Sequence, residues 1–166
     1  MATSSPSKLQ RAAAKTSRPR DLQRLDHQLC FALYSSSLVM TKLYKPVLGA
    51  LALTYPQYLV LLVLWETDAI GVGELGERLY LDSGTLTPLL KRMEAAGLLA
   101  RERAASDERR VIVTLTAAGR ALCRKAESVP RQVACATGCK LDEISRLTAQ
   151  LQALRSNVAH QLALAA

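Results

Sequence analysis

The chain of 166 residues lacks long apolar stretches and is poor in aromatic side chains. Its longest unbroken apolar run, from Tyr58 to Trp65, is far shorter than the ~20 residues that a helix needs to span a bilayer. No apolar core of a signal peptide follows Met1, so we expect a cytoplasmic protein without a membrane partner. In that compartment the four cysteines stay reduced unless a specific oxidant acts on them.

Several kinds of catalytic site are also missing. The sequence holds no paired carboxylates, no glycine-rich phosphate loop and no serine–histidine arrangement, and we expect neither an enzyme nor a cofactor. Aromatic residues make up 4% of the chain and hydrophobic residues 49%, and the apolar residues are mostly Leu, Ala and Val. This composition favours helices packed on helices, in one domain with a sizeable core or in two small ones.

Acidic residues are absent from residues 1–20. That segment carries five basic side chains, so it accounts for five of the eight excess positive charges and leaves +3 for the remaining chain. It is rich in Ser, Ala and Pro, and we predict a solvated, disordered arm that contacts phosphates or has no role. Its composition also allows a transit peptide. The domain then spans residues 21–166, and the net charge of +8 with a pI near 9.6 indicates an anionic partner.

A long apolar stripe opens the domain. Apolar residues recur at helical spacing from Leu22 to about Tyr44, where Pro46 and Gly49 are expected to interrupt the helix. The stripe is longer than a compact core needs. We therefore expect a second subunit to bury part of it.

Further helices are indicated by local signals. Thr54 begins a capping box with proline in the first turn, which predicts a buried helix through Glu66. A short helix is expected over 72–79. Thr116 caps another helix, which breaks near Pro130, and a last helix runs from about Leu141 to Leu164.

Residues 78–116, RLYLDSGTLTPLLKRMEAAGLLARERAASDERRVIVTLT, carry the most information. They are typical of a tight turn, a helix that begins with polar residues, and two strands joined by a charged hairpin. The helix is capped by Asp82 or Ser83 and ends at Gly97, a good left-handed terminator. Pro88 requires either a helix start near Thr85 or a tolerated distortion.

The two strands are expected over 98–103 and 109–115, with residues 104–108 at the hairpin tip. A helix that projects from a compact domain can enter a DNA major groove while a basic ribbon beside it reaches the adjacent minor groove. The sequence therefore predicts a DNA-binding part at about residues 55–116, in a mainly helical fold with a small β-wing. Helices at both ends of the domain predict a dimer with interwoven termini.

Specific side chains suit this interface. Asp107 can hold the base of the hairpin tip while Arg109 reaches a narrow minor groove, whose negative potential attracts it. Arg101, Arg103 and Arg110 could neutralise phosphates, which gives affinity without sequence information. The outward face of the helix offers hydroxyl groups for phosphates or base edges and two cations: Ser83, Thr85, Thr87, Lys91 and Arg92.

These motifs resemble a known family. DERR-VIVTLT-AAGR is similar to the wing and following helix of the MarR family of winged-helix repressors, and LDSGTLTPLLKRMEAAGLL is similar to that family's recognition segment, proline included. LCFALYSSS, MTKLYKP and LTYPQYLVLLVLWE together resemble the organic hydroperoxide resistance regulators, over roughly residues 24–130. The resemblance implies a winged helix-turn-helix, dimerised through its N- and C-terminal helices. It also implies a homodimer that binds a pseudo-palindromic operator until a thiol is oxidised.

Cys30, in LCFALY, is the expected sensor. A thiolate attacks a hydroperoxide to give a sulfenic acid, and hydrogen-bond donors favour the thiolate. Tyrosine supplies both a donor and an apolar wall for an organic hydroperoxide. The family pattern places two such donors, from the opposite subunit, at positions that match Tyr44 and Tyr55, and Tyr34 also matches the motif.

Three more cysteines bear on the fate of the oxidised thiol. Some members of the family carry a second cysteine in the C-terminal region, which resolves the sulfenic acid as an intersubunit disulfide. Cys135 is the choice that the resemblance implies, because its separation from Cys30 of 135 − 30 = 105 residues resembles the two-cysteine members. Cys139 could substitute for it, and Cys123 is expected to be structural.

Three other functions remain open. A MarR-type repressor could respond to a small aromatic ligand, with an inert Cys30. A zinc sensor could use His27 and Cys30 with Cys135 and Cys139. Cys30 could also serve a thiol peroxidase, although the wing would then lack a purpose.

Overall fold

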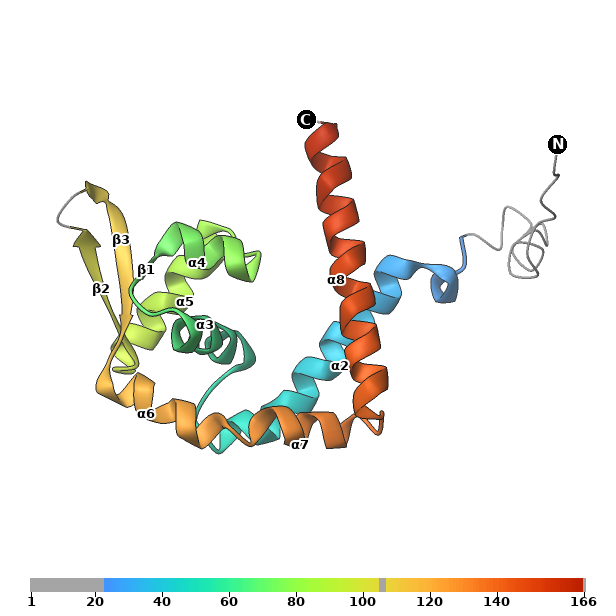
Figure 1. Cartoon of the computed structure of the whole chain (residues 1–166), viewed down its shortest axis with the longest axis horizontal. Coiled ribbons are helices and arrows are strands. Elements are labelled where there is room, and N and C mark those ends of the chain that lie inside the picture. Colours follow the sequence, from blue (N-terminus) through green and yellow to red (C-terminus); the bar gives the residue numbers. More distant parts are fainter. Residues whose placement is uncertain (1–22, 105–106, 166) are drawn as a thin grey trace, which may run out of the picture. The chain divides into compact units, whose positions relative to one another are not determined.

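The computed structural model describes residues 23–104 and 107–165. The chain divides after Thr41 into two compact units. The basic arm expected over 1–20 lies outside the described residues, as does the centre of the hairpin tip. Figure 1 shows the elements in sequence colours.

The first unit contains a short 3₁₀ helix, η1 (Leu25–His27), and most of α2 (Leu29–Gly49). The prediction of one helix from Leu22 to about Tyr44 is wrong at both ends. Gln28 has extended dihedral angles, φ −87° and ψ 113°, and separates η1 from α2. At the other end α2 continues through Pro46 to Gly49, because proline removes one backbone donor in the last turn without ending the helix.

The second unit begins with the end of α2 and continues into α3 (Tyr55–Glu66). The predicted start of α3 is confirmed, since the backbone N–H of Thr54 donates to Oε1 of Gln57 at 2.8 Å. Tyr58, Val60, Leu61, Val63 and Leu64 of α3 are buried, as its almost wholly apolar face predicts. This helix forms the centre of the core.

The helix-turn-helix comes next in the chain. The helix α4 (Val72–Leu79) has the predicted bounds, and α5 (Ser83–Ala95) comes after a turn at 80–82. Pro88 lies inside α5, so of the two alternatives left by the sequence the helix tolerates the proline in its second turn. Gly97 has φ +70°, a left-handed conformation that favours glycine, and it ends α5 as predicted.

The sheet has three strands in the order β1-β3-β2, all antiparallel. The strands β2 (Leu99–Ala104) and β3 (Asp107–Leu115) form the predicted hairpin, but they extend further into the tip than expected. The sequence missed β1 (Ile70–Gly71), which pairs Ile70 with Val113 and Gly71 with Ile112. Val113 and Leu115 are buried and Val111, on the same face of β3, is half-buried, so this face of the hairpin packs on the core.

Three helices complete the second unit. Thr116 caps α6 (Ala117–Ala126), and its Oγ1 accepts from the N–H of Gly119 at 3.1 Å. The predicted break near Pro130 is present, since α6 ends at Ala126 and a turn at 127–128 follows; Pro130 then lies in the first turn of a helix that the sequence did not predict, α7 (Val129–Ala136). The fixed φ of proline explains this outcome, because it suits the start of a helix. The last helix, α8 (Leu141–Leu164), has the predicted bounds.

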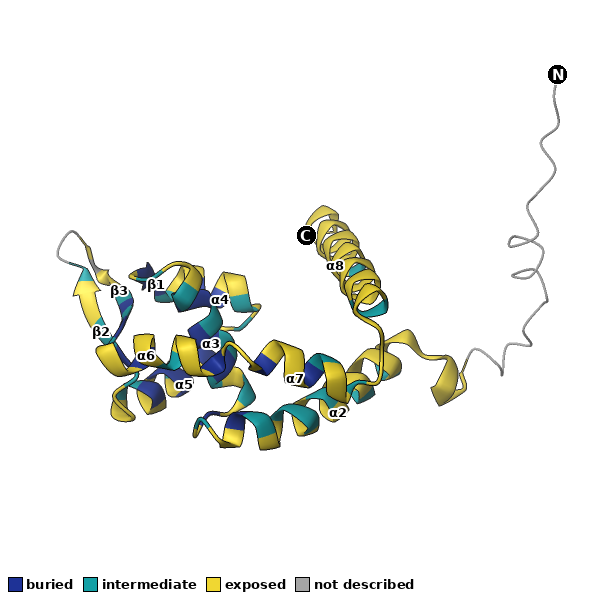
Figure 2. Cartoon of the chain, turned by 60° about the horizontal axis from the view of Figure 1, so that its bottom comes forward, coloured by how far each residue is buried: buried dark blue, intermediate teal, exposed yellow. Residues whose placement is uncertain are grey.

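Burial differs sharply between these elements (Figure 2). Most of the core side chains come from α3, α4, α5 and the sheet, and Leu48 of α2, Ala126 of α6 and Val129 and Val133 of α7 are buried as well. In contrast, no residue of α8 is buried in the single chain. Within the described residues, none of the helices combines the length and the apolar character required to cross a membrane.

Candidate nucleic-acid interface and thiol sites

The start of α5 is fixed by Asp82. Its Oδ1 accepts from the backbone N–H of Thr85 at 2.8 Å, and its Oδ2 accepts from the Thr85 hydroxyl at 3.0 Å. The backbone hydrogen bond, followed by the hydroxyl bond, holds the pKa of Asp82 below its usual value of 3.8. The sequence left the cap open between Asp82 and Ser83, and the structure assigns it to Asp82.

The two faces of α5 divide as predicted. Leu86, Leu89, Leu90 and Met93 are at most 4% exposed and anchor the helix to the core. The expected nucleic-acid contacts occupy the other face: Ser83, Thr85, Lys91 and Arg92 are exposed and Thr87 is half-buried. A helix anchored on one side and polar on the other can present its outer side to a groove of DNA.

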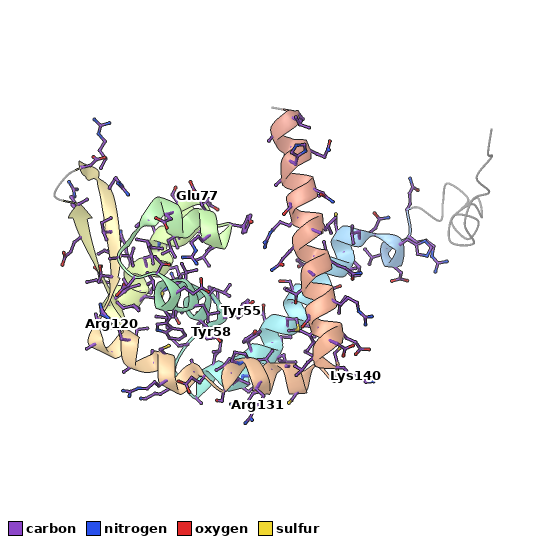
Figure 3. The ribbon with its side chains drawn as sticks, viewed as in Figure 1. Tyr55, Tyr58, Glu77, Arg120, Arg131 and Lys140 are labelled. Atoms are coloured by element: carbon purple, nitrogen blue, oxygen red, sulfur yellow. The ribbon has the colours of Figure 1, made fainter. Side chains whose placement is uncertain are left out.

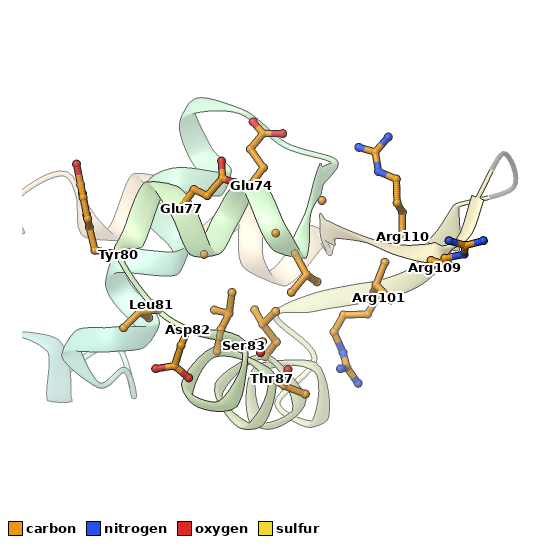
Figure 4. Close-up of a pocket in the computed structure, with 17 residues that line it drawn as sticks. Glu74, Glu77, Tyr80, Leu81, Asp82, Ser83, Thr87, Arg101, Arg109 and Arg110 are labelled. Atoms are coloured by element: carbon orange, nitrogen blue, oxygen red, sulfur yellow. The ribbon is translucent and has the colours of Figure 1, made fainter. Parts of the chain in front are cut away.

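A groove of about 960 Å³ separates α5 from the hairpin (Figure 4). Ser83 and Thr87 of α5 line one side, and Arg109 and Arg110 of β3 line the other. Glu74 and Glu77 of α4 also border it, so the cations are concentrated towards the hairpin. The structure thus brings hydroxyl groups of α5 and guanidinium groups of the hairpin to the same groove.

The hairpin holds its own tip through Asp107, whose Oδ1 accepts from the backbone N–H of Arg109 at 3.0 Å. The side chains of Arg103, Arg109 and Arg110 are exposed. A register shift between Arg103 and Ala104 distorts the ladder near the tip. The described part of the hairpin therefore presents three exposed cations, and Asp107 stabilises the backbone at the start of β3.

Arg101 differs from the other hairpin arginines. Its Nε donates to Oε2 of Glu94 at 3.0 Å, and its backbone N–H donates to Oε1 of the same carboxylate at 3.1 Å. The side-chain hydrogen bond from Arg101 is the main reason why the pKa of Glu94 is lowered. Arg101 therefore fastens β2 to the last turn of α5, and its contact with a phosphate stays a prediction.

The base of the wing is anchored by Asp68, a residue that the sequence did not single out. Its Oδ1 accepts from the backbone N–H of Leu115 at 2.9 Å, and its Oδ2 forms an ion pair with Arg120 at 2.8 Å. Arg120 also donates to the carbonyl oxygen of Leu115 at 3.0 Å. Figure 3 labels Arg120 where the hairpin meets α6. These bonds join the end of α3 to β3 and α6, which are distant in the sequence, so no local pattern indicates them.

The structure brings together two of the predicted tyrosines. The ring centroids of Tyr44 and Tyr55 are 4.5 Å apart, and burial, with a contribution from the neighbouring tyrosines, raises the pKa of Tyr44 to about 12. Burial also raises the pKa of Tyr55. Both phenols therefore remain protonated donors at neutral pH. Within residues 23–104 and 107–165 neither hydroxyl takes part in a hydrogen bond.

Tyr58 extends this cluster and was missed as a site residue, although it stands in the same LTYPQY motif. Its ring centroid lies 6.1 Å from that of Tyr44 and 6.1 Å from that of Trp65. The indole N–H of Trp65 donates to the carbonyl oxygen of Gly119 at 3.0 Å. The tyrosines are thus continuous with the packing at the start of α6.

The four cysteines are free and exposed in the single chain, including Cys123, for which the sequence predicted a structural role. Cys30 is the second residue of α2, and Tyr34 lies one turn further along the same face and is 61% exposed. Cys135 lies in α7, and Cys139 follows Gly138, where its N–H donates to the Thr137 hydroxyl at 3.2 Å. Among the described residues, no three His, Cys, Asp or Glu side chains gather as a metal site.

Comparison with known proteins identifies the fold. Residues 42–126 match the family described as transcriptional regulator SarA/Rot. The organic hydroperoxide resistance transcriptional regulator of Bacillus subtilis is 56% identical over 110 residues, which cover 66% of this chain and 75% of the relative. The chain belongs to the MarR/SarA-type winged-helix transcriptional regulators.

Two further relatives agree. The HTH-type transcriptional regulator TtmR of Methylorubrum extorquens is 49% identical over 138 residues, covering 83% of this chain and 71% of the relative. Reduced AbfR bound to DNA, a Staphylococcus epidermidis protein, superposes with a TM-score of 0.71 at 35% identity, covering 86% of this chain and 98% of that chain. The disulfide-containing form of AbfR superposes with a TM-score of 0.54 at 36% identity, covering 81% of this chain and 95% of that chain.

The family assignment gives the elements their roles. In this MarR/SarA-type regulator α4 and α5 are the helix-turn-helix, α5 is the recognition helix, and β2 with β3 is the wing. The predicted winged helix-turn-helix is confirmed, and so is a function in regulating transcription.

Proposed function

We propose that this regulator is a homodimeric repressor that releases a pseudo-palindromic operator when an organic hydroperoxide oxidises Cys30. The observation that carries the proposal is the pair formed by Tyr44 and Tyr55. Their rings lie 4.5 Å apart, and their hydroxyl groups have no hydrogen-bond partner within the described part of the chain. Half-buried phenols without a partner are suited to donate to an anion that another chain brings, and the Cys30 thiolate of a second subunit is that anion.

The apolar surface of α8 supports the homodimer. Leu147, Leu151, Val158 and Leu162 share one stripe of this helix and are 53%, 47%, 50% and 67% exposed. In the first unit, Leu29 and Leu33 of α2 are 57% and 37% exposed. Such a large apolar area is rarely left in water by a monomer, so a second copy of the chain is the proposed cover.

The sensing chemistry starts at the Cys30 sulfur. The thiolate attacks the terminal oxygen of the hydroperoxide and the O–O bond breaks, so the sulfur takes the terminal OH group and becomes a sulfenic acid. The alkoxide that leaves takes a proton from water and is released as the alcohol. The thiol of Cys135 on the partner subunit then attacks the sulfenic sulfur, and a disulfide forms with loss of water. The two cysteines are oxidised and the hydroperoxide is reduced, so each event consumes one hydroperoxide.

The disulfide is proposed to move the recognition helices. Two half-sites one helical turn apart require recognition helices separated by about 34–36 Å. A disulfide holds its two Cα atoms within ~4.4–6.8 Å, which restricts where α7 of one subunit can lie against α2 of the other. Displacement of the two subunits changes the separation of their recognition helices, and the dimer no longer fits the operator.

On the operator, Arg109 is proposed to enter the minor groove, and Arg103 and Arg110 to neutralise phosphates. Lys91 and Arg92 of α5 are likewise proposed to neutralise phosphates beside the recognition helix. The hydroxyl groups of Ser83, Thr85 and Thr87 are proposed to form hydrogen bonds with phosphates or base edges. The Thr85 hydroxyl donates to Asp82 at 3.0 Å, so that bond has to break before this hydroxyl can donate to DNA.

A gel shift with the DNA upstream of the chain's own gene tests the proposal. The wild type should bind in the reduced state and dissociate after an organic hydroperoxide is added, whereas Cys30→Ser should stay bound. Cys135→Ser should form the sulfenic acid without an intersubunit disulfide. Cys123→Ser is the matched control, because Cys123 is equally a free exposed thiol, and it should behave as wild type.

Each alternative has its own outcome. Release of Cys30→Ser by hydroperoxide as readily as the wild type would favour a repressor controlled by a small aromatic ligand. Continuous consumption of hydroperoxide with an added thiol, and no operator binding, would favour a thiol peroxidase. If Cys135→Ser still forms a Cys30-dependent disulfide, Cys139 is the resolving residue. All of this chemistry is placed in the cytoplasm, where the thiols are reduced until an oxidant arrives.

A further inference from the structure

Tyr80 stands at the corner of the helix-turn-helix in an unusual conformation. It is the C-cap of α4, with φ 56° and ψ 37°, in the left-handed region that few residues other than glycine adopt. Its N–H donates to the carbonyl oxygen of Glu77 at 3.2 Å, and the next N–H, of Leu81, donates to that of Gly76 at 3.0 Å. These bonds fix the backbone of the turn, and with it the direction of the Cα–Cβ bond of Tyr80.

The ring nevertheless takes no part in the apolar core. Tyr80 is 66% exposed, and Figure 4 shows it at the end of the groove away from Arg109 and Arg110. Asp82, only two residues further on, caps the recognition helix α5. A displacement of the Tyr80 ring can therefore move the start of α5, because the cap Asp82 follows only two residues after Tyr80.

In the described part of the chain, the Tyr80 ring has a cationic partner on α8. The guanidinium carbon of Arg155 lies 4.5 Å from the centroid of the Tyr80 ring. A cation at this distance over an aromatic face is attracted by the ring quadrupole. The planar guanidinium of an arginine can in general also stack on an aromatic ring, which the compact ammonium of a lysine does not do.

No hydrogen bond or ion pair joins α8 to α4 or α5 in the part of the chain that the structure describes. The contact between Arg155 and Tyr80 therefore links α8 to the end of α4 without such a bond. The helix α8 carries the exposed apolar stripe that the second copy is proposed to cover. The recognition helix α5 carries the proposed DNA contacts. The contact between Arg155 and Tyr80 thus connects α8, which carries the proposed dimer interface, with the turn that leads into the recognition helix α5 of the same subunit.

We infer that Arg155 and Tyr80 form a clasp that fixes the direction of the recognition helix relative to α8, and through it the half-site spacing that the dimer accepts. The inference rests on the proposed function, because it requires a dimer on a two-part operator. Arg155 acts through Tyr80 and the turn, and is a positioning residue that touches no base. Its loss should widen the range of spacings that are bound and leave the contacts with each half-site unchanged.

The experiment measures binding of the full-length protein to a set of DNA duplexes. These carry the two half-sites of the upstream operator at the natural spacing, or with one or two base pairs inserted or removed. A single half-site duplex is measured beside them. The wild type should prefer the natural spacing. Arg155→Gln should reduce that preference by roughly two- to fivefold per subunit, the range that corresponds to an exposed cation–π contact, with unchanged affinity for the single half-site.

Variants of Tyr80 test the same link from the other side. Tyr80→Phe keeps the aromatic face and should retain the wild-type preference. Tyr80→Asn removes the face, and asparagine tolerates the left-handed backbone, so it should match Arg155→Gln. The double variant should be no worse than either single variant, because both remove one interaction. Arg146→Gln is the matched control, an exposed arginine of the same helix, and should behave as wild type.

Three outcomes would overturn the clasp: unchanged spacing preference in Arg155→Gln and Tyr80→Asn, an equal loss at every spacing and at the single half-site, or an equal effect of Arg146→Gln. Failure of the wild type to bind the operator at any spacing would instead refute the proposed function. The two failures are therefore distinguishable in one experiment.

Discussion

Replacing Gly119 with alanine should destabilise the wing by an amount that its surroundings determine. A Cβ atom at this position would lie 2.1 Å from the carbonyl oxygen of Leu98 and 3.0 Å from Cδ2 of Leu115. Even a close contact between carbon and a carbonyl oxygen keeps about 3.3–3.6 Å. The obstructing atom belongs to the backbone, so the β2 segment and α6 would have to separate by about 1 Å.

The separation also strains a bond, because the carbonyl oxygen of Leu98 accepts from the N–H of Thr116 at 3.2 Å. Overpacking of this kind costs about 1–3 kcal/mol, and a backbone obstacle places Gly119→Ala at the upper end. Alanine recovers about 1 kcal/mol of helix propensity in α6. We therefore expect a net loss of about 2 kcal/mol in the free energy of unfolding.

Urea unfolding followed by circular dichroism, at one fixed protein concentration, measures this loss. The matched control is Gly73→Ala, since Gly73 is helical and exposed and has no atom within 4 Å of the added methyl group. That variant should be as stable as the wild type or up to about 1 kcal/mol more stable. If Gly119→Ala unfolds within about 0.5 kcal/mol of the wild type, the close packing between Leu98 and α6 is refuted.

Four other features of the chain are open to direct tests. Absorbance of the phenolate should show one tyrosine that ionises near pH 12, and Tyr44→Phe should remove it, because burial disfavours the charged form. The pKa of Asp82 is lowered in the folded chain, so the ionised carboxylate stabilises the fold above the pKa of the unfolded chain, and this stabilisation is lost as the pH falls through the lower folded pKa. Asp82→Asn should therefore weaken the acid dependence of the urea midpoint below pH 3.8. Thr116→Ala should cost about 1 kcal/mol of unfolding free energy through loss of the cap of α6, and Thr116→Ser should retain it. In operator titrations over a range of salt, Arg103→Ala should lower the slope of log K against log salt by about 1 for each phosphate that the arginine neutralises.

The sequence predicts those elements whose signals are adjacent in the chain. The capping box at Thr54, the left-handed Gly97 and the periodic stripe of α8 each act within a few residues, and the structure has all three. Prolines were harder to interpret, because Pro46 and Pro88 each remove only one hydrogen-bond donor and the surrounding helix persists.

Features formed by distant residues could not be predicted in this way. The two-residue strand at Ile70 depends on its pairing with Val113, and the anchor at Asp68 depends on Leu115 and Arg120. For the site, the partnership of Tyr44 with Tyr55 came from the family resemblance, since nothing in their spacing requires two rings to meet. The engagement of Arg101 by Glu94 was also invisible, because an arginine in a basic hairpin has the same sequence context whether it faces a phosphate or a carboxylate.

The exposed leucines along α8 have a consequence for the degradation of the chain in a cell. A subunit that has just left the ribosome carries Leu147, Leu151 and Leu162 about half exposed or more, on a helix without any buried residue. Chaperones and proteases recognise such apolar, weakly protected segments, so a subunit of the proposed homodimer that has not yet associated is a target for degradation. On that proposal, the abundance of the regulator should fall more than in proportion when its synthesis is reduced, because fewer subunits associate before they are degraded.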